Sequence, residues 1–216
     1  GLVGSEMCIR DSNNVRSILV DRTGRVWVGT KLGLNVFDGD RIRVFTIHQG
    51  MPNDNIYCSF QDNEGNIWFG TDGAGAIKFL GDRFVTYTVK DGMCSDLVMT
   101  IVADGQGDRW LGTYDNGVCR MDGMAIVTTR EGLPNNTIWC GLKDRNDALW
   151  FGTNEGLTKI ERGIPVPLPP EIAMPELRIL SLLEDAQGRI WCGTREGLAV
   201  VNTLSLIHIS EPTRPY

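Results

Sequence analysis

The feature that most constrains this chain is a motif of tryptophan, one variable residue, glycine and threonine that occurs five times. Its tryptophans are Trp27, Trp68, Trp110, Trp150 and Trp191. The intervals between them are 41, 42, 40 and 41 residues, so each copy belongs to one repeated supersecondary unit. We expect the tryptophans to be structural anchors that pack between units, because a packing role would recur in every copy.

Each copy also predicts a tight turn between two strands. An aspartate stands six residues before each tryptophan, and a glycine, or once Asp147, stands three residues before it. Aspartate can bond its own backbone, glycine supplies positive φ, and aspartate tolerates that conformation better than most residues. The strand before the turn alternates large, small and large residues, which suits a strand crowded by neighbouring copies near a ring axis. This pattern places the small residues Cys58 and Cys140 in the core.

Two further strands are predicted after the Gly-Thr pair. A third strand begins with glycine in every copy, and a fourth fits residues 41–46, 83–88 and 125–129. In the fourth copy this region is rich in proline, which restricts it to an edge strand. Four strands in a unit of this length are typical of a propeller blade, and no copy shows the apolar period of a helical solenoid. We predict an all-β propeller of about five four-stranded blades, with the last blade truncated after its third strand and the ring incomplete.

The two ends of the chain are predicted to lie outside the propeller. Residues 204–209 and 7–11 can be encoded by opposite strands of one DNA duplex, and residues 210–214 pair with 2–6 in the same way. The pattern resembles a transposase-type sequencing adapter. We therefore assign residues 1–12 and 204–216 to adapter-like sequence and residues 13–203 to the propeller, and we expect the parent protein to continue past residue 203. The predicted blades are approximately 13–52, 53–94, 95–134, 135–175 and 176–203.

Residues 49–71 and 131–157 closely resemble the two-component regulator propeller repeat. The shared parts are the Gly-Met/Leu-Pro approach, the aspartate turn, the Trp-x-Gly-Thr core and the glycine that opens the third strand. The resemblance implies a periplasmic sensor region of a bacterial membrane receptor, followed by a β-sandwich domain, a membrane helix and a histidine kinase or diguanylate cyclase. It also implies a small-molecule ligand such as an oligosaccharide, a homodimer in the parent receptor, and membrane attachment only through segments outside this chain.

Composition and motifs exclude several other classes of function. The formal net charge is −6 without a basic cluster, which argues against nucleic-acid binding, and no apolar run is long enough to cross a membrane. The sequence has no HExxH, GxSxG, CxxC or complete P-loop motif, so we expect no catalytic residue, metal or cofactor. His48, the one histidine outside the adapter-like ends, is interpreted as an exposed loop residue.

The cysteine pattern argues against a disulfide framework. Five cysteines remain outside the adapter-like ends, an odd number without close spacing, and we interpret them as small buried residues. They are Cys58, Cys94, Cys119, Cys140 and Cys192.

Ligand recognition is predicted in the loops that join the strands at one face of the ring, because a rigid scaffold commonly binds through its variable loops. These loops are rich in asparagine and aspartate, with Tyr57 and Trp139 nearby. Amide and carboxylate groups beside aromatic rings suit a polyhydroxylated ligand. Our hypothesis is a polar site lined by Asn55, Asp72, Tyr114, Asn116 and Asn154. The alternative for each is a solvated turn residue.

Three functions remain open from the sequence. The first is a ligand-sensing module that shifts a signalling equilibrium. The second is a propeller enzyme of the streptogramin-lyase kind, which needs a cluster of histidine and acidic residues at the mouth of the ring. The third is a structural platform for protein interaction.

Overall fold

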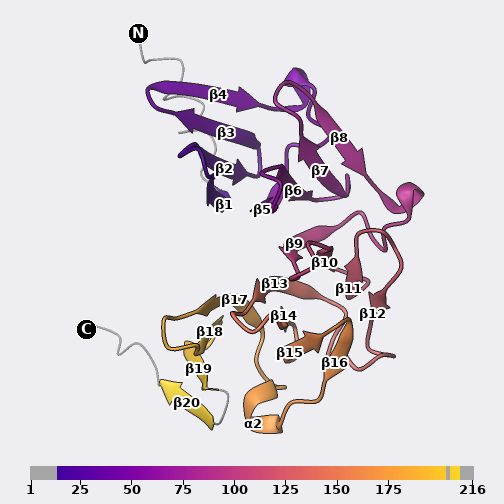
Figure 1. Ribbon diagram of the computed structural model, residues 1–216, viewed down its shortest axis with the longest axis vertical. Helices are drawn as coiled ribbons and strands as arrows, with labels where there is room; N and C mark the ends of the chain where they lie inside the picture. The colour runs from indigo at the N-terminus through magenta and orange to yellow at the C-terminus, as the bar shows by residue number, and fades with distance from the viewer. Residues whose placement is uncertain (1–13, 203–204, 210–216) are drawn as a thin grey trace. The chain divides into compact units, whose positions relative to one another are not determined.

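The computed structural model describes residues 14–202 and 205–209. Within these residues the chain forms five antiparallel four-stranded sheets, and strands adjacent in sequence are neighbours in each sheet (Figure 1). The chain divides into two compact units, residues 1–101 and 102–216, and the division falls within strand β9 (Val98–Ala103).

The first unit contains the first two sheets. The first sheet consists of β1 (Val15–Val20), β2 (Val26–Thr30), β3 (Gly33–Asp38) and β4 (Arg41–Phe45). The second consists of β5 (Ile56–Gln61), β6 (Ile67–Thr71), β7 (Ala76–Phe79) and β8 (Phe84–Tyr87). Two short 3-10 helices, η1 (Ile47–Gln49) and η2 (Val89–Asp91), follow the outer strands. Trp27 packs against Phe69 and Phe79 of the next sheet at ring-centroid distances of 5.8 and 5.2 Å, so the first tryptophan joins two sheets.

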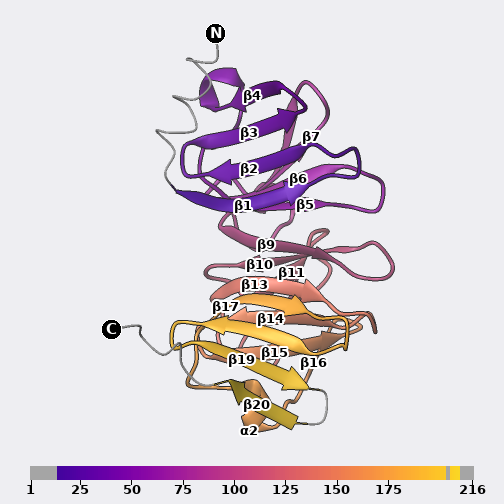
Figure 2. The same cartoon turned by 90° about the vertical axis from the view of Figure 1, so that its left-hand side faces the viewer.

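The second unit contains the third, fourth and fifth sheets (Figure 2). The third sheet consists of β9, β10 (Arg109–Thr113), β11 (Val118–Arg120) and β12 (Ile126–Val127). The fourth consists of β13 (Ile138–Lys143), β14 (Leu149–Thr153), β15 (Gly156–Glu161) and β16 (Ile164–Val166), followed by helix α2 (Pro170–Ala173). The fifth consists of β17 (Ile179–Glu184), β18 (Ile190–Thr194), β19 (Leu198–Asn202) and β20 (Ser205–Ile209).

The fifth sheet differs from the expectation that it ends after its third strand. Strand β20 pairs antiparallel with β19 and consists of adapter-like sequence. Three of its five residues are leucine or isoleucine, so this segment can pair with the open edge of β19 whatever its origin. The other adapter-like residues, 1–12, 204 and 210–216, lie outside the described residues.

One hydrogen-bond arrangement recurs in the turns of all five sheets. One carboxylate oxygen of the turn aspartate accepts two backbone N–H groups of the turn, as Asp144 does from Asn146 and Ala148. The other accepts the indole N–H of the tryptophan. The distances are 2.8 Å for Trp27–Asp21, 2.7 Å for Trp68–Asp62, 2.9 Å for Trp110–Asp104, 2.8 Å for Trp150–Asp144 and 2.8 Å for Trp191–Asp185. The aspartate therefore fixes the turn and also satisfies the polar atom of a large apolar side chain.

Two of the turn aspartates, Asp21 and Asp185, are held in the ionised form. Burial of Asp21 opposes ionisation, but hydrogen bonds from Thr23, Trp27 and Arg25 outweigh it and hold the pKa of that carboxyl well below its usual range. The pKa of Asp185 is lowered in the same way, against the effect of burial, by hydrogen bonds that include those from Trp191 and Arg189. In the fourth turn Asp147 has a φ of 67°, which confirms that it takes the left-handed place of the missing glycine.

The glycine of the Gly-Thr pair is required by close contact with its neighbours. A Cβ atom on Gly152 would lie 2.6 Å from Cys140 Sγ on the adjacent strand and 2.7 Å from Ile179 Cγ2 of the next sheet. A Cβ on Gly70 would lie 2.6 Å from Cys58 Sγ. These distances are shorter than atoms in contact can adopt. The small residue of the inner strand and the glycine therefore pack together, which explains why both are small.

The cysteines do not all behave as predicted. Cys94 and Cys119 are disulfide-bonded, which corrects the expectation that the cysteines are unpaired. The spacing of cysteines in the sequence does not predict which of them are disulfide-bonded, because that depends on which sulfur atoms lie close together in the folded chain. Cys58, Cys140 and Cys192 are free, and burial raises the pKa of each thiol to about 12.

Candidate functional site

The inner strands of four sheets carry a β-bulge at the same position. In the first, second, fourth and fifth sheets the pairing register shifts by one residue near the start of the inner strand. The unpaired residues at these bulges are Arg16, Tyr57, Trp139 and Leu180. A bulge redirects a side chain away from the regular alternation of the strand. These four residues therefore lie where each inner strand meets the loops predicted to bind ligand.

In the first unit, two pairs of side chains in contact lie at or near the bulge residue Tyr57 in the sequence, and we call these four residues the first bulge group. The guanidinium carbon of Arg16 lies 4.3 Å from the centre of the Tyr57 ring. Asn55 Nδ2 donates to Asp72 Oδ2 at 2.6 Å, so two residues of the predicted site are in direct contact. Asn55 Oδ1 and Arg16 Nη1 are buried and have no hydrogen-bond partner among the described residues. Buried atoms of this kind normally have a hydrogen-bond partner, so Asn55 Oδ1 could accept a hydrogen bond from a ligand and Arg16 Nη1 could donate one to it.

In the second unit, the bulge residue Trp139 belongs to a similar group. Its indole N–H donates to Asn154 Oδ1 at 2.8 Å. Tyr114 packs edge-on against its ring at a centroid distance of 5.8 Å, and the guanidinium carbon of Arg178 lies 5.5 Å from the ring centre. Tyr114 remains 47% exposed, so part of this aromatic surface faces solvent.

The structure thus joins the predicted site residues into two groups, one in each unit. Asn55 and Asp72 meet in the first unit, and Tyr114 and Asn154 meet through Trp139 in the second. Asn116 lies in the same loop as Tyr114, where its backbone N–H donates to the Thr113 hydroxyl. The residue pattern does not indicate the two arginines, Arg16 and Arg178. Arg16 stands at a bulge, which leaves no mark in the sequence, and Arg178 lies just before β17.

Other polar residues in these loops maintain the loops themselves. The side-chain oxygens of Asp54, Asp96 and Asn136 each accept the backbone N–H of the residue seven positions earlier, at 2.6, 2.8 and 2.9 Å. This role recurs in three copies, so these three residues stabilise the loop backbone. His48 is exposed within η1. Within residues 14–202 and 205–209, no three histidine, cysteine or acidic side chains form a group that could hold a metal ion.

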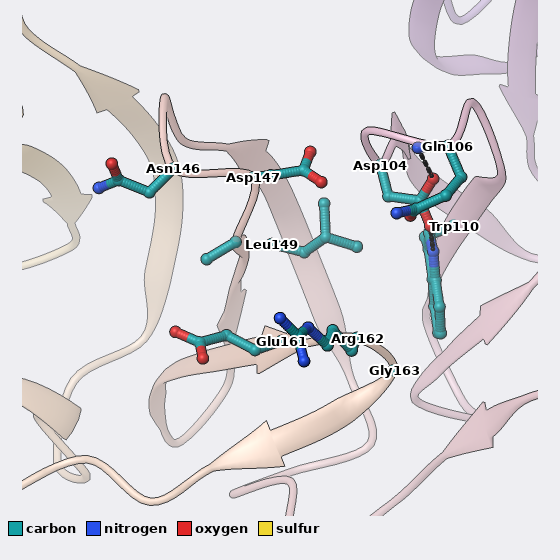
Figure 3. Close-up of a pocket in the computed structure, with 10 residues that line it drawn as sticks. Asp104, Gln106, Trp110, Asn146, Asp147, Leu149, Glu161, Arg162 and Gly163 are labelled. Carbon is teal, nitrogen blue, oxygen red and sulfur yellow. Dashed lines mark hydrogen bonds between the residues drawn. The ribbon is translucent and has the colours of Figure 1, made fainter.

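A cavity of about 340 Å³ lies at the turn end of the second unit, away from the predicted site (Figure 3). Three turns surround it, those between β9 and β10, between β13 and β14, and between β15 and β16. It is lined by Asp104, Gln106, Trp110, Asn146, Asp147, Ala148, Leu149, Glu161, Arg162 and Gly163. The residue pattern does not predict this cavity, although Asp147, which replaces the turn glycine of the other copies, lies at its edge.

Comparison with known proteins gives a family match and a fold. Residues 10–31, 50–73, 132–155 and 173–196 match the family described as two component regulator propeller. No curated protein matches the chain. Among the described residues, none of the helices has the length and apolar character needed to cross a bilayer.

Three solved structures illustrate the likeness of the fold. One is the extracellular domain of a protein described as a hybrid two-component system, BT3049 from B. thetaiotaomicron (23% identity, 92% of this chain, 30% of that chain, TM-score 0.73). Another is the extracellular domain of BT4673 from the same organism, described as a one-component system (20% identity, 95% and 32% coverage, TM-score 0.80). The third is virginiamycin B lyase from Staphylococcus aureus (17% identity, 93% and 71% coverage, TM-score 0.70).

These likenesses establish the predicted β-propeller fold. The chain spans about a third of the length of the two extracellular domains.

Proposed function

This chain carries two-component regulator propeller repeats, and from that premise we propose that it is the ligand-sensing part of a bacterial transmembrane receptor and performs no catalysis. The observation that carries the proposal is the family match at four separate repeats. Two similar structures that are extracellular domains of signalling systems support it, and their greater length leaves room for further blades in the parent protein.

The two bulge groups support a polyhydroxylated ligand. A tyrosine or tryptophan face can pack against the C–H surface of a sugar ring, and neighbouring amide and guanidinium groups can bond its hydroxyls. Both units offer this combination, with Arg16 and Tyr57 in the first and Arg178 and Trp139 in the second. We propose that ligand contacts come from the predicted residues in these groups: Asn55, Asp72, Tyr114, Asn116 and Asn154.

A periplasmic location fits the cysteine chemistry. Cys94 and Cys119 are disulfide-bonded, and disulfides form and persist mainly in oxidising compartments such as the bacterial periplasm. This favours exposure of the sensor outside the cytoplasm. Protease treatment of spheroplasts that express the parent receptor tests this location, since a periplasmic propeller is degraded while the inner membrane is intact.

Ligand binding is tested by thermal unfolding of the full chain with a panel of oligosaccharides from arabinan, galactan, xylan and homogalacturonan. A bound ligand at one hundred times its Kd stabilises the folded state by about 2.7 kcal/mol, so at least one class should raise the Tm clearly. Tyr57→Ala and Trp139→Ala identify which group binds it. Leu180→Ala, at the equivalent bulge of the fifth sheet, is the matched control and should leave the shift intact. The proposal fails if no saccharide raises the Tm, or if the shift survives in both aromatic variants.

The lyase alternative has a separate test. A similar structure is a virginiamycin B lyase that was also crystallised as a catalytically inactive histidine variant with quinupristin. The described part of this chain brings no histidine into either bulge group. Incubation with quinupristin, followed by mass spectrometry, should therefore show the compound unchanged. A linearised product would show that the chain is an enzyme.

A further inference from the structure

In two pairs of neighbouring sheets an arginine connects the turns. Arg22 follows the turn aspartate of the first sheet, its backbone N–H donates to Gln61 Oε1 at 2.9 Å, and its Nη1 donates to Asn63 O at 2.8 Å. Arg145 holds the same place in the fourth sheet and bonds the equivalent residues of the fifth, Glu184 and Ala186. We call this arrangement the arginine strap.

The strap is absent between the third and fourth sheets. The residue after the turn aspartate of the third sheet is Gly105, which has no side chain to reach across. The turn position opposite it also differs. In the fifth sheet that position is Gly188, and a Cβ there would lie 3.4 Å from the Arg145 guanidinium carbon, so the strap passes over a glycine. In the fourth sheet it is Asp147, whose carboxylate would meet a Cβ on Gly105. Between the fourth and fifth sheets, Arg145 thus faces Gly188. Between the third and fourth sheets, Gly105 faces Asp147 instead.

The space left by the missing strap is the cavity of about 340 Å³ in Figure 3. Figure 3 shows the Asp147 carboxylate and the Arg162 guanidinium on opposite sides of the Leu149 side chain, with the Gln106 amide facing the Asp147 side. Leu149 is 3% exposed and provides an apolar surface between the two charges.

The charged groups of the cavity differ in how far they are already paired. Asp104 is occupied by the Trp110 indole and by backbone N–H groups of its own turn, and Glu161 pairs with Lys159 Nζ at 2.5 Å. Asp147 has only a loose contact with Lys143 at 3.6 Å. Arg162 makes no ion pair or hydrogen bond with any described residue. Asp147 and Arg162 are therefore the charges that remain for a ligand.

Both of these residues are held in a backbone conformation that side chains normally avoid. The described residues include three non-glycine residues with positive φ, and two of them are Asp147 (φ 67°) and Arg162 (φ 52°). Strained backbone tends to persist where a side chain serves a function. Glycine would fit either position without strain, and glycine stands at the position of Asp147 in the other four copies. The two charged side chains are thus kept in the cavity despite an unfavourable backbone.

We propose that this cavity is a binding site for a free α-amino acid, separate from the loop site of the proposed function. A carboxylate and a guanidinium that share one cavity without pairing suit a ligand with an ammonium group for Asp147 and a carboxylate for Arg162. Arg162 can bind the ligand carboxylate with two parallel N–H donors. The Gln106 amide oxygen can accept from the ammonium, and the aliphatic part of the ligand lies over Leu149.

The first test is isothermal titration calorimetry of the full chain with each of the twenty free proteinogenic L-amino acids. At least one should bind, and the N-acetyl and carboxamide derivatives of the best binder should each bind at least tenfold more weakly, because each derivative removes one of the two charges. The proposal is overturned if no amino acid binds, or if both derivatives bind as well as the parent compound.

The second test uses variants whose folding is not in doubt, since glycine suits both positions. Asp147→Gly and Arg162→Gly should each weaken binding at least tenfold without lowering the Tm. Arg83→Gly, in the equivalent outer turn of the second sheet, is the matched control and should leave affinity unchanged. Gly105→Arg with Asp147→Gly rebuilds the strap, so it should abolish binding and raise the Tm. Undiminished affinity in both single variants would overturn the assignment, whatever the saccharide panel shows at the loop site.

Discussion

The two ends of each sheet are built on different rules. At the turn end, all five copies repeat the same aspartate, the same indole hydrogen bond and nearly the same distance. At the loop end, the residue after the Gly-Thr pair differs in every copy. It is Lys31, Asp72, Tyr114, Asn154 and Arg195 in turn. The repeated turn end holds the sheets together, and the variable loop end carries the residues for which we propose ligand contacts.

The variation at the loop end is confined to single positions. The framework of these loops is itself repeated, since Asp54, Asp96 and Asn136 make the same bond to the backbone in three copies. The residues after the Gly-Thr pair make side-chain contacts that differ between copies: Asp72 accepts from Asn55, and Asn154 accepts from the Trp139 indole. Stability and recognition are therefore assigned to different residues of the same loop, and the two can be separated by mutation.

The largest effect is expected from removing an indole at the turn end. Trp150→Ala creates a cavity and leaves the Asp144 carboxylate without its indole partner, so it should destabilise the folded state by about 3–5 kcal/mol. Urea unfolding followed by circular dichroism measures this loss. Tyr114→Ala removes a partly exposed aromatic at the loop end and is the matched control. Equal losses in the two variants would contradict the distinction between the ends.

A smaller loss is expected where the sheets approach most closely. Gly152→Ala forces a methyl group against Cys140 Sγ and Ile179, and overpacking of this kind costs about 1–3 kcal/mol. The same urea experiment reports it. Because the clash is partly with the sulfur, adding Cys140→Ala should recover part of the loss. Additive losses in the double variant would show that the contact is not the cause.

Acid should weaken the turn end selectively. The pKa of Asp21 and of Asp185 is lower in the folded state than in the unfolded chain, where it is about 3.9. Their contribution to stability is complete above that value and is lost as the pH falls below it towards the folded-state pKa. The urea midpoint should therefore change little from pH 7 to 5 on account of these groups and fall below about pH 4. Asp185→Asn should show a shallower fall, and a midpoint unchanged at pH 3 would refute this account.

The smallest effect on stability is expected at the loop end. Asn154→Ala removes the acceptor of the Trp139 indole in a partly exposed site, and the free energy of unfolding should change by less than about 0.5 kcal/mol. The same variant should lower affinity for whichever oligosaccharide raises the Tm of the unmodified chain. A large loss of stability with unchanged affinity would reverse the roles assigned to the two ends.

The sequence was sufficient to predict the architecture because the five copies of the repeat can be aligned with one another. A fixed interval of six residues from aspartate to tryptophan predicted the turn and the packing role, although the hydrogen bond between the two side chains was not foreseen. The constancy of that interval in five copies was the signal for it. The large, small and large alternation likewise predicted a crowded inner strand, although the contact of Cys140 with Gly152 follows only from the structure.

The site was less predictable because it depends on departures from the repeat. A bulge adds one residue without changing the residue types around it, so Tyr57 and Trp139 were noticed only as nearby aromatics and Arg16 and Arg178 were missed. The turn-end cavity depends on Gly105, which looks like any loop glycine until Asp147 is seen opposite it. The disulfide-bonded state of Cys94 and Cys119 depends on folding in space, which sequence spacing does not record.

The three free thiols have a consequence for the disulfide-bonded cysteines. A protein that acquires disulfides while it also keeps unbonded cysteines is exposed to exchange, in which a thiolate attacks an existing bond and rearranges it. With a pKa of about 12, Cys58, Cys140 and Cys192 are thiolates in only about one molecule in 10⁵ at neutral pH once the sheets have formed. Folding of the sheets thus also protects the disulfide-bonded cysteines from exchange with these three thiols.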